Sequence, residues 1–411
     1  MVSPGTFLPH HLPAPPENGR LVILAAGKAA GSMAAVAEAH YLDTLGFPAG
    51  RLSGLAVARH GYGVPMRIVE MLEAGHPVPD LQGVVAAERM LALADECGEE
   101  DLVVFLLSGG ASANLVAPVA NVTLEEKQVL TRALLRSGAS IDHINAVRKH
   151  LSRIKGGRLA RQVAPARLVT LALSDVPHDD LSTIGSGPTV PDLSTLEEAR
   201  MVLERFGIVA PASILAALNN PENETLKPGD PAFARASAII AARPADAFSA
   251  ACGEAERLGY RVVNLGGDLE GEARAIAHQH AAIALREAES GERIALISGG
   301  ELTVTIKGDG QGGPNQEYAL ALAIELEGAR GIVALAADTD GTDGGAGKPT
   351  DPAGAFVDPT TLRRARANGL DPAEFLGRND STGFFSALGD LHACGPTLTN
   401  ANDLRVILIG H

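Results

Sequence analysis

The sequence predicts an α/β fold divided into two domains. The chain has 411 residues, which exceeds what one ordinary hydrophobic core organises, so two domains are expected. Short apolar runs alternate with amphipathic stretches along most of the chain, a pattern typical of βαβ units and mostly parallel sheets. Aromatic residues make up only 3% and Trp is absent. The core must therefore be packed from Val, Leu, Ile and Ala, as in parallel sheets covered by helices.

Six apolar runs predict buried strands, each followed by a turn rich in Gly, Ser or Asp. They are residues 21–26, 102–107, 168–173, 262–265, 294–297 and 332–336. Amphipathic stretches between them predict helices at 29–44, 83–97, 123–137, 145–162, 195–206, 244–258, 272–288 and 316–325. Thr123 and Glu126 form a capping box at one of these starts. The polar stretch 219–230 contains two prolines and a glycine and predicts a boundary near residue 235, giving domains at 1–235 and 236–411.

Charge and composition exclude several classes of protein. With 34 basic and 49 acidic side chains the formal net charge is −15, which argues against a nucleic acid as the main partner. No apolar run approaches the ~20 residues of a membrane helix, and no signal peptide is recognisable at the N-terminus. Cys97, Cys252 and Cys394 are too widely spaced for a zinc site or a disulfide framework. We expect a cytoplasmic protein without a membrane partner, while homo-oligomerisation stays open.

Strand ends in the first half carry residues suited to anions. Ligands in open α/β sheets bind beyond the carboxyl ends of the strands. Lys28 follows the first strand at a helix start, where a cation does not help the helix; a surface lysine is the alternative. The turn Ser108-Gly109-Gly110 could direct backbone N–H groups at an anion, or could simply be a tight turn. Asp175 ends another strand, a usual place for a Mg²⁺ ligand or a general base.

The most basic segment of this acidic chain lies at residues 145–158. It contains Arg148, Lys149, Arg153, Lys155 and Arg158 and no acidic residue between them. Such a segment could bind phosphates or a carboxylate, although a solvated helix face is the alternative. We favour an anion-binding role.

Carboxylates and glycines gather in the second half. Asp338, Asp340 and Asp343 repel one another unless a cation lies among them, and a solvated turn is the alternative. The segment Gly308–Gly313 matches G-x-G-x-x-G ahead of a predicted helix, as in a dinucleotide-binding fingerprint. However, residues 302–307 alternate apolar and polar side chains, as a half-exposed strand does. We interpret this loop as a flexible lid or a phosphate loop.

Five segments taken together resemble the glycerate 2-kinase family, whose members are often named hydroxypyruvate reductase or linked to tartrate utilisation. They are residues 27–30, 106–113, 174–192, 297–323 and 334–344. The resemblance implies a Rossmann-like, mostly parallel N-terminal domain, a smaller mixed-sheet C-terminal domain, and an active site in the cleft between them. It also implies Mg²⁺-dependent transfer of the ATP γ-phosphate to the 2-hydroxyl of D-glycerate. An NAD(P)H-dependent hydroxypyruvate reductase and a non-catalytic anion-binding module are the alternatives.

Two features depart from the family pattern. Members often begin with a helix ahead of the first strand, whereas this chain has a Pro-rich lead. Many members also carry Arg, a proposed catalytic residue, where this chain has Pro314. Another cation must then meet the charge that develops during transfer.

The candidate residues divide by role. For catalysis we expect Lys28, Asp175 and Arg148, and for substrate binding Ser108, Gly109, Gly110 and Lys149. For the nucleotide we expect Ser298, Gly299, Gly300, Glu301, Asn315, Gln316 and Glu317, and for Mg²⁺ Asp175, Asp338 and Asp340. The expected partners are D-glycerate and ATP, with 2-phosphoglycerate as product.

Overall fold

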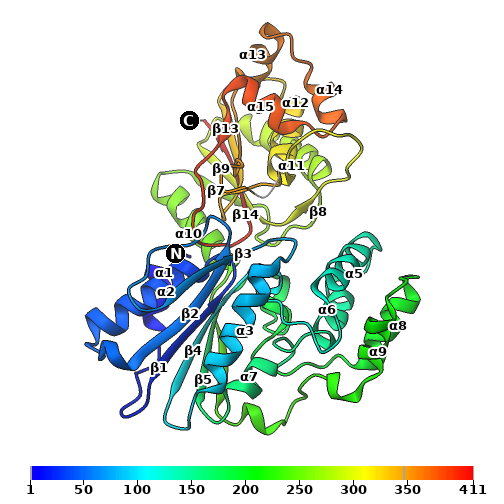
Figure 1. Ribbon diagram of the computed structural model, residues 1–411. Coiled ribbons are helices and arrows are strands. Elements are labelled where there is room, and N and C mark those ends of the chain that lie inside the picture. Colours follow the sequence, from blue (N-terminus) through cyan, green and yellow to red (C-terminus); the bar gives the residue numbers. More distant parts are fainter. Residues whose placement is uncertain (1, 346–347, 411) are drawn as a thin grey trace. The chain divides into compact units, whose positions relative to one another are not determined.

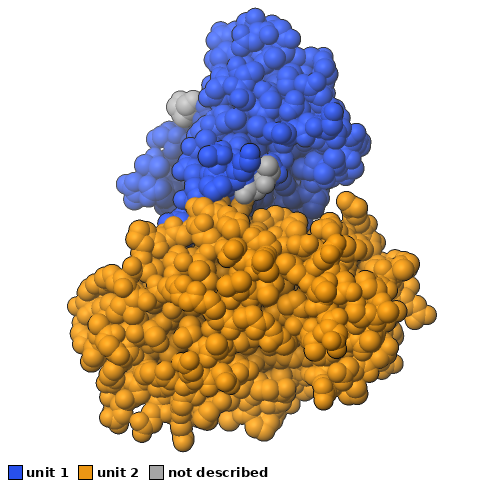
Figure 2. All heavy atoms as spheres, viewed as in Figure 1, with its two compact units in different colours: residues 1–2, 243–411 blue, residues 3–242 orange. Residues whose placement is uncertain are grey.

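The computed structural model describes residues 2–345 and 348–410. The chain forms two compact units, Ser3–Ala242 and Arg243–His411, the second together with Met1–Val2 (Figure 2). They are called the N-terminal and C-terminal units below. The sequence places a boundary near residue 235, and the structure divides the chain after Ala242.

The N-terminal unit is built on a parallel sheet of six strands. These are β1 (Leu21–Ala26), β2 (Leu52–Arg59), β3 (Glu70–Ala74), β4 (Leu102–Ser108), β5 (Arg167–Leu173) and β6 (Ala236–Ala242). Their order is β3-β2-β1-β4-β5-β6 with every pair parallel, which is the Rossmann strand order. The expected Rossmann-like sheet is therefore confirmed. The order reverses between β1 and β4, so the carboxyl ends of these two strands form the topological switch point.

Helices cover both faces of this sheet (Figure 1). They include α2 (Ala30–Ala39), α3 (Leu81–Asp95) and α7 (Arg158–Val163). Alternate side chains of β1, such as Val22 and Leu24, pack in one core with Met90 of α3 and Leu159 of α7. Helix α2 contacts β1, β2 and β4. Ahead of β1, the Pro-rich lead contains the four-residue helix α1 (Pro4–Phe7), which continues into a 3-10 turn at Leu8–His10.

A group of helices in the same unit has a core of its own. It comprises α5 (Leu124–Arg136), α6 (Ile141–His150), α8 (Leu196–Arg205) and α9 (Ala212–Asn219). Leu130, Val147, Leu203 and Ile214 pack together there, and Figure 1 shows these helices beside the sheet. The prediction of a single helix over 145–162 is wrong. The chain leaves the helical conformation between α6 and α7, where two glycines have φ angles of 59° and 81°, which a helix does not allow.

The C-terminal unit contains a mixed sheet, as the family resemblance implies. Its strands are β7 (Arg261–Asn264), β9 (Ile294–Gly300), β11 (Ile332–Asp338), β12 (Gly354–Val357), β13 (Leu391–His392) and β14 (Asp403–Ile409). The order is β13-β12-β11-β14-β9-β7, and within it only β7 and β9 run parallel in the described residues. Side chains of β9 alternate between two cores, with Ala295 and Ile297 on one face and Ile294 and Leu296 on the other.

The helices of this unit are α10 (Pro244–Arg257), α11 (Ala273–Ala288), α12 (Pro314–Leu326), α13 (Thr361–Ala367), α14 (Pro372–Gly377) and α15 (Ser381–Leu388). Phe248 of α10 packs on the face of Ala295 and Ile297. Helix α12 is buried on nearly all sides from Asn315 to Ala323, so polar residues at its start need partners inside the unit. No helix in the described part of the chain is both long and apolar enough to span a bilayer.

The glycine-rich loop 308–313 does not belong to a parallel βαβ unit. The strand before it, β10 (Leu302–Thr303), pairs with the two-residue β8 (Gly271–Glu272) and, within the described residues, with no strand of the main sheet. Strand β11, after α12, is antiparallel to both of its neighbours. The glycines instead allow close packing, because a Cβ on Gly308 or Gly310 would clash with the backbone of Arg378. The loop therefore lacks the frame of a dinucleotide-binding fingerprint.

Candidate active site

The turns after β1 and β4 are joined at the switch point. The Lys28 N–H donates to the carbonyl of Gly109 at 2.8 Å, and the Ala29 N–H donates to Ser108 Oγ at 3.0 Å. Gly27 has φ 118°, and a Cβ there would clash with Ser108, so only glycine suits this approach. The structure thus brings together four of the predicted residues, Lys28 and the Ser108–Gly110 turn.

Within this turn the residues have different tasks. Ser108 is fully buried, and its hydroxyl, which accepts from Ala29, holds the turn together. Gly110 has φ 84°, and a Cβ built on it would lie 3.2 Å from Lys28 Cγ and 3.1 Å from His76 Cδ2. The Lys28 and His76 side chains therefore flank Gly110. Gly110 is also the N-cap of the short helix α4 (Ala111–Asn114).

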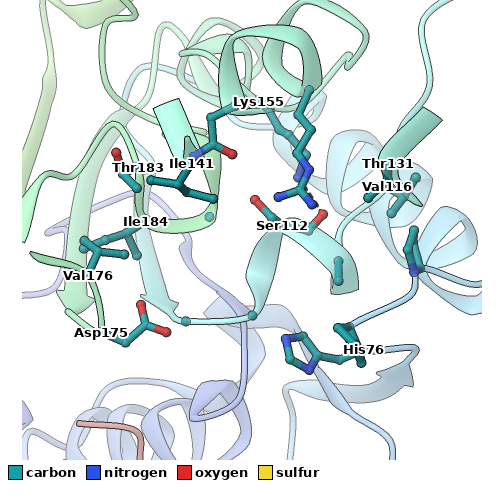
Figure 3. Close-up of a pocket in the computed structure, with 18 of the residues that line it drawn as sticks. His76, Ser112, Val116, Thr131, Ile141, Lys155, Asp175, Val176, Thr183 and Ile184 are labelled. Atoms are coloured by element: carbon teal, nitrogen blue, oxygen red, sulfur yellow. Dashed lines mark hydrogen bonds between the residues drawn. The ribbon is translucent and has the colours of Figure 1, made fainter. Parts of the chain in front are cut away.

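A pocket of about 260 Å³ opens beside this turn (Figure 3). Gly109, Gly110 and Ser112 line it from the switch point, and Asp175 and Ile184 line it from the segment after β5. Figure 3 shows Asp175 and His76 entering from different loops. The remaining wall comes from α5, α6, the segment after α6 and the loop after β3, which contributes His76, Pro77 and Pro79. Ligands are expected at this end of such a sheet.

Three cationic side chains line the pocket. They are Lys127 of α5, Arg148 of α6 and Lys155, and Asp175 is the only acidic residue among the lining residues described. Lys127 Nζ donates to the carbonyl of Leu151 at 2.7 Å, and burial, with Arg148 nearby, lowers its pKa to about 7. Charges so placed favour an anionic ligand.

Lys155 and Arg148 differ in how they are held. Lys155 Nζ donates to the carbonyls of Ser112 at 2.9 Å and Leu115 at 3.1 Å. Its burial, together with the charges of Lys127 and Arg148, lowers its pKa well below the usual range. Burial also lowers the pKa of Arg148. Among residues 2–345 and 348–410, the Arg148 guanidinium has no hydrogen-bond or ion-pair partner.

The other cations of the basic segment have structural partners. Lys149 Nζ forms a buried ion pair with Asp192 at 3.0 Å, so its side chain does not line the pocket. Arg153 pairs with Glu88 on the surface. Arg158 donates to backbone carbonyls, among them that of Lys149 at 2.9 Å.

The predicted nucleotide-binding residues lie in an internal network of the C-terminal unit. Arg405 of β14 donates to Ser298 Oγ at 3.2 Å and to the carbonyls of Gly299 and Gly300. It also pairs with Asp403 at 3.1 Å. Glu301, by contrast, is exposed.

The start of α12 is bound to the aspartate loop. Asp343 accepts from the backbone N–H groups of Asn315 and Gln316 at 3.0 and 2.9 Å, and from both of their side-chain amides. Burial raises the pKa of Asp343 to about 6 despite these donors. Glu317 accepts from Arg274 at 2.6 Å and from Asn379 at 3.1 Å. These side chains therefore stabilise the unit.

The carboxylates predicted for Mg²⁺ lie in two places. Asp338 Oδ1 accepts from the Asp340 N–H at 2.8 Å, and Asp340 Oδ1 accepts from Thr342. Asp175 belongs to the N-terminal unit. Within the described residues, no group of three or more His, Cys, Asp or Glu could hold a metal ion. A site made of one or two carboxylates and substrate phosphates remains compatible with these residues, because Mg²⁺ in kinases is usually held that way.

Lys127 and His76 line the pocket but were not predicted from the sequence. A signal for Lys127 was present, because Lys127, Leu130 and Leu134 form one buried stripe of α5. A lysine within an apolar stripe is unusual unless it is paired or functional. His76 carries no comparable signal, since it follows an edge strand.

Comparisons with known proteins agree with this architecture. Residues 1–219 match a domain family described as of unknown function (DUF4147), and residues 294–403 match the MOFRL family. A D-glycerate 2-kinase of Thermotoga maritima is 42% identical over 95% of this chain and 91% of its own length. An Agrobacterium vitis protein provisionally named hydroxypyruvate reductase is 47% identical over 98% of this chain and 90% of its own length.

A solved structure shares the fold. The crystal structure of a glycerate kinase from Thermotoga maritima has a TM-score of 0.84 and 40% identity, and the match covers 99% of this chain and 95% of that one. The strand order, the joined turns at the switch point and these relatives lead to one conclusion. The chain belongs to the glycerate 2-kinase family.

Proposed function

We propose that this chain is a Mg²⁺-dependent kinase that transfers the γ-phosphate of ATP to the 2-hydroxyl of D-glycerate, giving 2-phosphoglycerate. The observation that carries the proposal is the pocket at the switch point. Three basic residues line it, Lys127, Arg148 and Lys155, and Asp175 is the one acidic residue among the described lining residues. The names of the relatives, glycerate 2-kinase and glycerate kinase, support it.

The residues at the switch point suit phosphoryl transfer, which depends on positioning and on neutralising charge. Lys28 flanks Gly110, and we assign it to the transferring phosphate. The backbone at Gly109 and Gly110 would contribute N–H donors. Asp175, at the end of β5, would orient the 2-hydroxyl. Since Pro314 replaces an Arg found in many members, Lys28 is the cation proposed to meet the developing charge, and Arg148 would assist by binding the substrate.

For the metal and the nucleotide we keep the assignments made from the sequence. Asp175, Asp338 and Asp340 are the carboxylates proposed for Mg²⁺, which when bound would neutralise charge on the β- and γ-phosphates. Segments 298–301 and 315–317 are the proposed nucleotide contacts. The hydrogen bonds of Arg405 and Asp343 would hold the backbone of these segments in place.

The test follows two reactions in parallel. With D-glycerate and Mg·ATP, we expect glycerate-dependent ADP release that EDTA stops, and ³¹P NMR should identify 2-phosphoglycerate. With hydroxypyruvate and NADH or NADPH, we expect no nicotinamide oxidation, because loop 308–313 lacks a parallel βαβ frame. The names of the Agrobacterium vitis relatives make the second assay necessary. Steady nicotinamide oxidation without glycerate-dependent ADP would favour the reductase.

A further inference from the structure

Arg148 is a cation prepared for a ligand. A guanidinium offers five N–H donors in a planar fork that matches a carboxylate. In the described part of the chain, none of these donors has a partner, although Arg148 lines the pocket and burial lowers its pKa. Arg148 is half-buried, so its guanidinium is only partly hydrated, and this incomplete hydration costs free energy. An anion that enters the pocket would remove this cost.

Lys127 and Lys155 complete the same wall. Lys127 ties α5 to the carbonyl of Leu151, and Lys155 ties the segment after α6 to the carbonyls of Ser112 and Leu115. Both ammonium groups are thus held in place beside the pocket. An ammonium group has three donors, and these contacts use one of them in Lys127 and two in Lys155. A donor of Lys127 therefore remains for a ligand, and Lys155 offers its third donor once a bound acid draws a proton onto it, because burial lowers the pKa of Lys155 well below the usual range.

The rest of the pocket defines what the ligand must carry. The opposite lining includes Gly109, Gly110 and Asp175, the residues assigned above to the reacting phosphate and the hydroxyl. A molecule with its anionic group at Arg148 would place its remaining atoms toward that turn. The volume of about 260 Å³ lies below that of most drug-sized sites, so the ligand is a small acid.

We propose that Lys127, Arg148 and Lys155 form a carboxylate subsite, and that this subsite restricts the acceptors to small 2-hydroxy acids. This assignment rests on the proposed kinase function and deepens it. It gives Arg148 to the acceptor's carboxylate, whereas Lys28 meets the phosphate. Uncharged polyols such as glycerol lack the recognised group and are poor acceptors.

The experiment compares Arg148→Gln and Arg148→Lys with the matched control Arg153→Gln. Arg153 lies in the same basic segment but pairs with Glu88 on the surface. For Arg148→Gln we expect KM for D-glycerate to rise about 10- to 100-fold, the range for a lost charged hydrogen bond, with KM for ATP unchanged within about twofold. The preference for D-glycerate over glycerol should fall by the same factor. Arg148→Lys keeps the charge but loses the planar fork of donors, so its KM for D-glycerate should lie between those of the unchanged protein and Arg148→Gln.

Direct binding separates this proposal from the kinase assignment. Calorimetry with D-glycerate, D-lactate and glycerol requires no turnover. Binding of both acids but not of glycerol, lost in Arg148→Gln and kept in Arg153→Gln, supports the subsite even if no ADP is formed. Equal KM and binding in the Arg148 and Arg153 variants would overturn the subsite and leave the kinase standing. Should Arg148→Gln fail to fold by circular dichroism, Arg148→Lys decides, and unchanged constants in it reject the proposal.

Discussion

Lys28 occupies a position where a cation serves a ligand better than it serves the fold. It lies at the start of α2, where the helix dipole disfavours positive charge, and its backbone N–H makes the contact to Gly109 that any residue could make. We expect Lys28→Ala to fold normally and to lose about 10²–10³-fold in kcat, as for other removed donors to a developing charge. Circular dichroism measures the folding of the variant, and ADP release measures its kcat. A loss below about threefold would make Lys28 a bystander.

Lys127 should make anion binding depend on pH. Its pKa is lowered to about 7 by burial and by Arg148 and Arg158, and Lys155, Asp175 and His76 also border the pocket. Because the folded pKa lies below the unfolded one, Lys127 is neutral in the free protein above pH 7, and a bound carboxylate draws a proton onto it. Affinity for D-lactate should therefore fall as pH rises from 6 to 9.

Calorimetry at several pH values in buffers of different ionisation enthalpy measures this proton uptake. Lys127→Met serves as the comparison variant, since it removes the titrating group but keeps a long side chain. Its affinity should be weak and nearly independent of pH over this range. An unchanged pH profile in Lys127→Met would assign the titration to another group.

At the residue scale, the sequence could predict what lies at strand ends. Lys28, the Ser108–Gly110 turn and Asp175 follow strands whose apolar runs are plain. Arg148 and Lys149 could not be distinguished, because neighbouring helix positions point about 100° apart and the phase was unknown. One lines the pocket and the other pairs with Asp192. The stripe of Lys127, Leu130 and Leu134 indicates a buried face of α5, but no local pattern predicts that this helix packs beside the sheet.

At the scale of elements, the start of α12 depends on Asp343. Its carboxylate accepts two backbone N–H groups and two side-chain amides. Asp343→Asn places a donor against these donors, so we expect a loss of about 1–3 kcal/mol in the free energy of unfolding. Urea titration at pH 8, well above the pKa of about 6, measures it.

Asp371→Asn is the matched control for that change. Asp371 caps α14 through the Ala373 N–H at 2.9 Å in an exposed position, where Asn and Asp serve equally well. Its stability should change by less than about 0.5 kcal/mol. If both variants lose the same free energy of unfolding, the hydrogen bonds of Asp343 contribute no more to stability than an ordinary exposed helix cap.

Neither edge strand of the parallel sheet was predicted from the sequence. β3 and β6 are edge strands of the parallel sheet. β3 contains two glutamates, and residues 236–240 of β6 are all exposed or half-exposed. β14 was missed for another reason. It carries Asp403 and Arg405, which look like surface charges in the sequence but form a buried pair. Central strands with continuous apolar runs, such as β1, β4 and β5, were predictable because both of their faces are covered.

For the whole molecule, the division into two units predicts which segments a bound acid protects from hydrogen exchange. The described residues that line the pocket all belong to the N-terminal unit. Hydrogen exchange with saturating D-lactate should therefore show its strongest protection in segments 109–116, 141–155 and 175–185. Arg148→Gln should abolish this protection. Protection as strong in β9 or β14 would show that the acid binds elsewhere.

The basic side chains that line the pocket also determine how salts affect the stability and the activity of the protein. Any compact anion can approach Arg148, so sulfate, phosphate and even concentrated chloride become competitors of the substrate. Such salts raise the melting temperature by mass action while they slow turnover. In sulfate or phosphate buffers, the protein should therefore have a higher melting temperature and a lower activity. Its affinity for the substrate should be measured at low concentrations of multivalent anions.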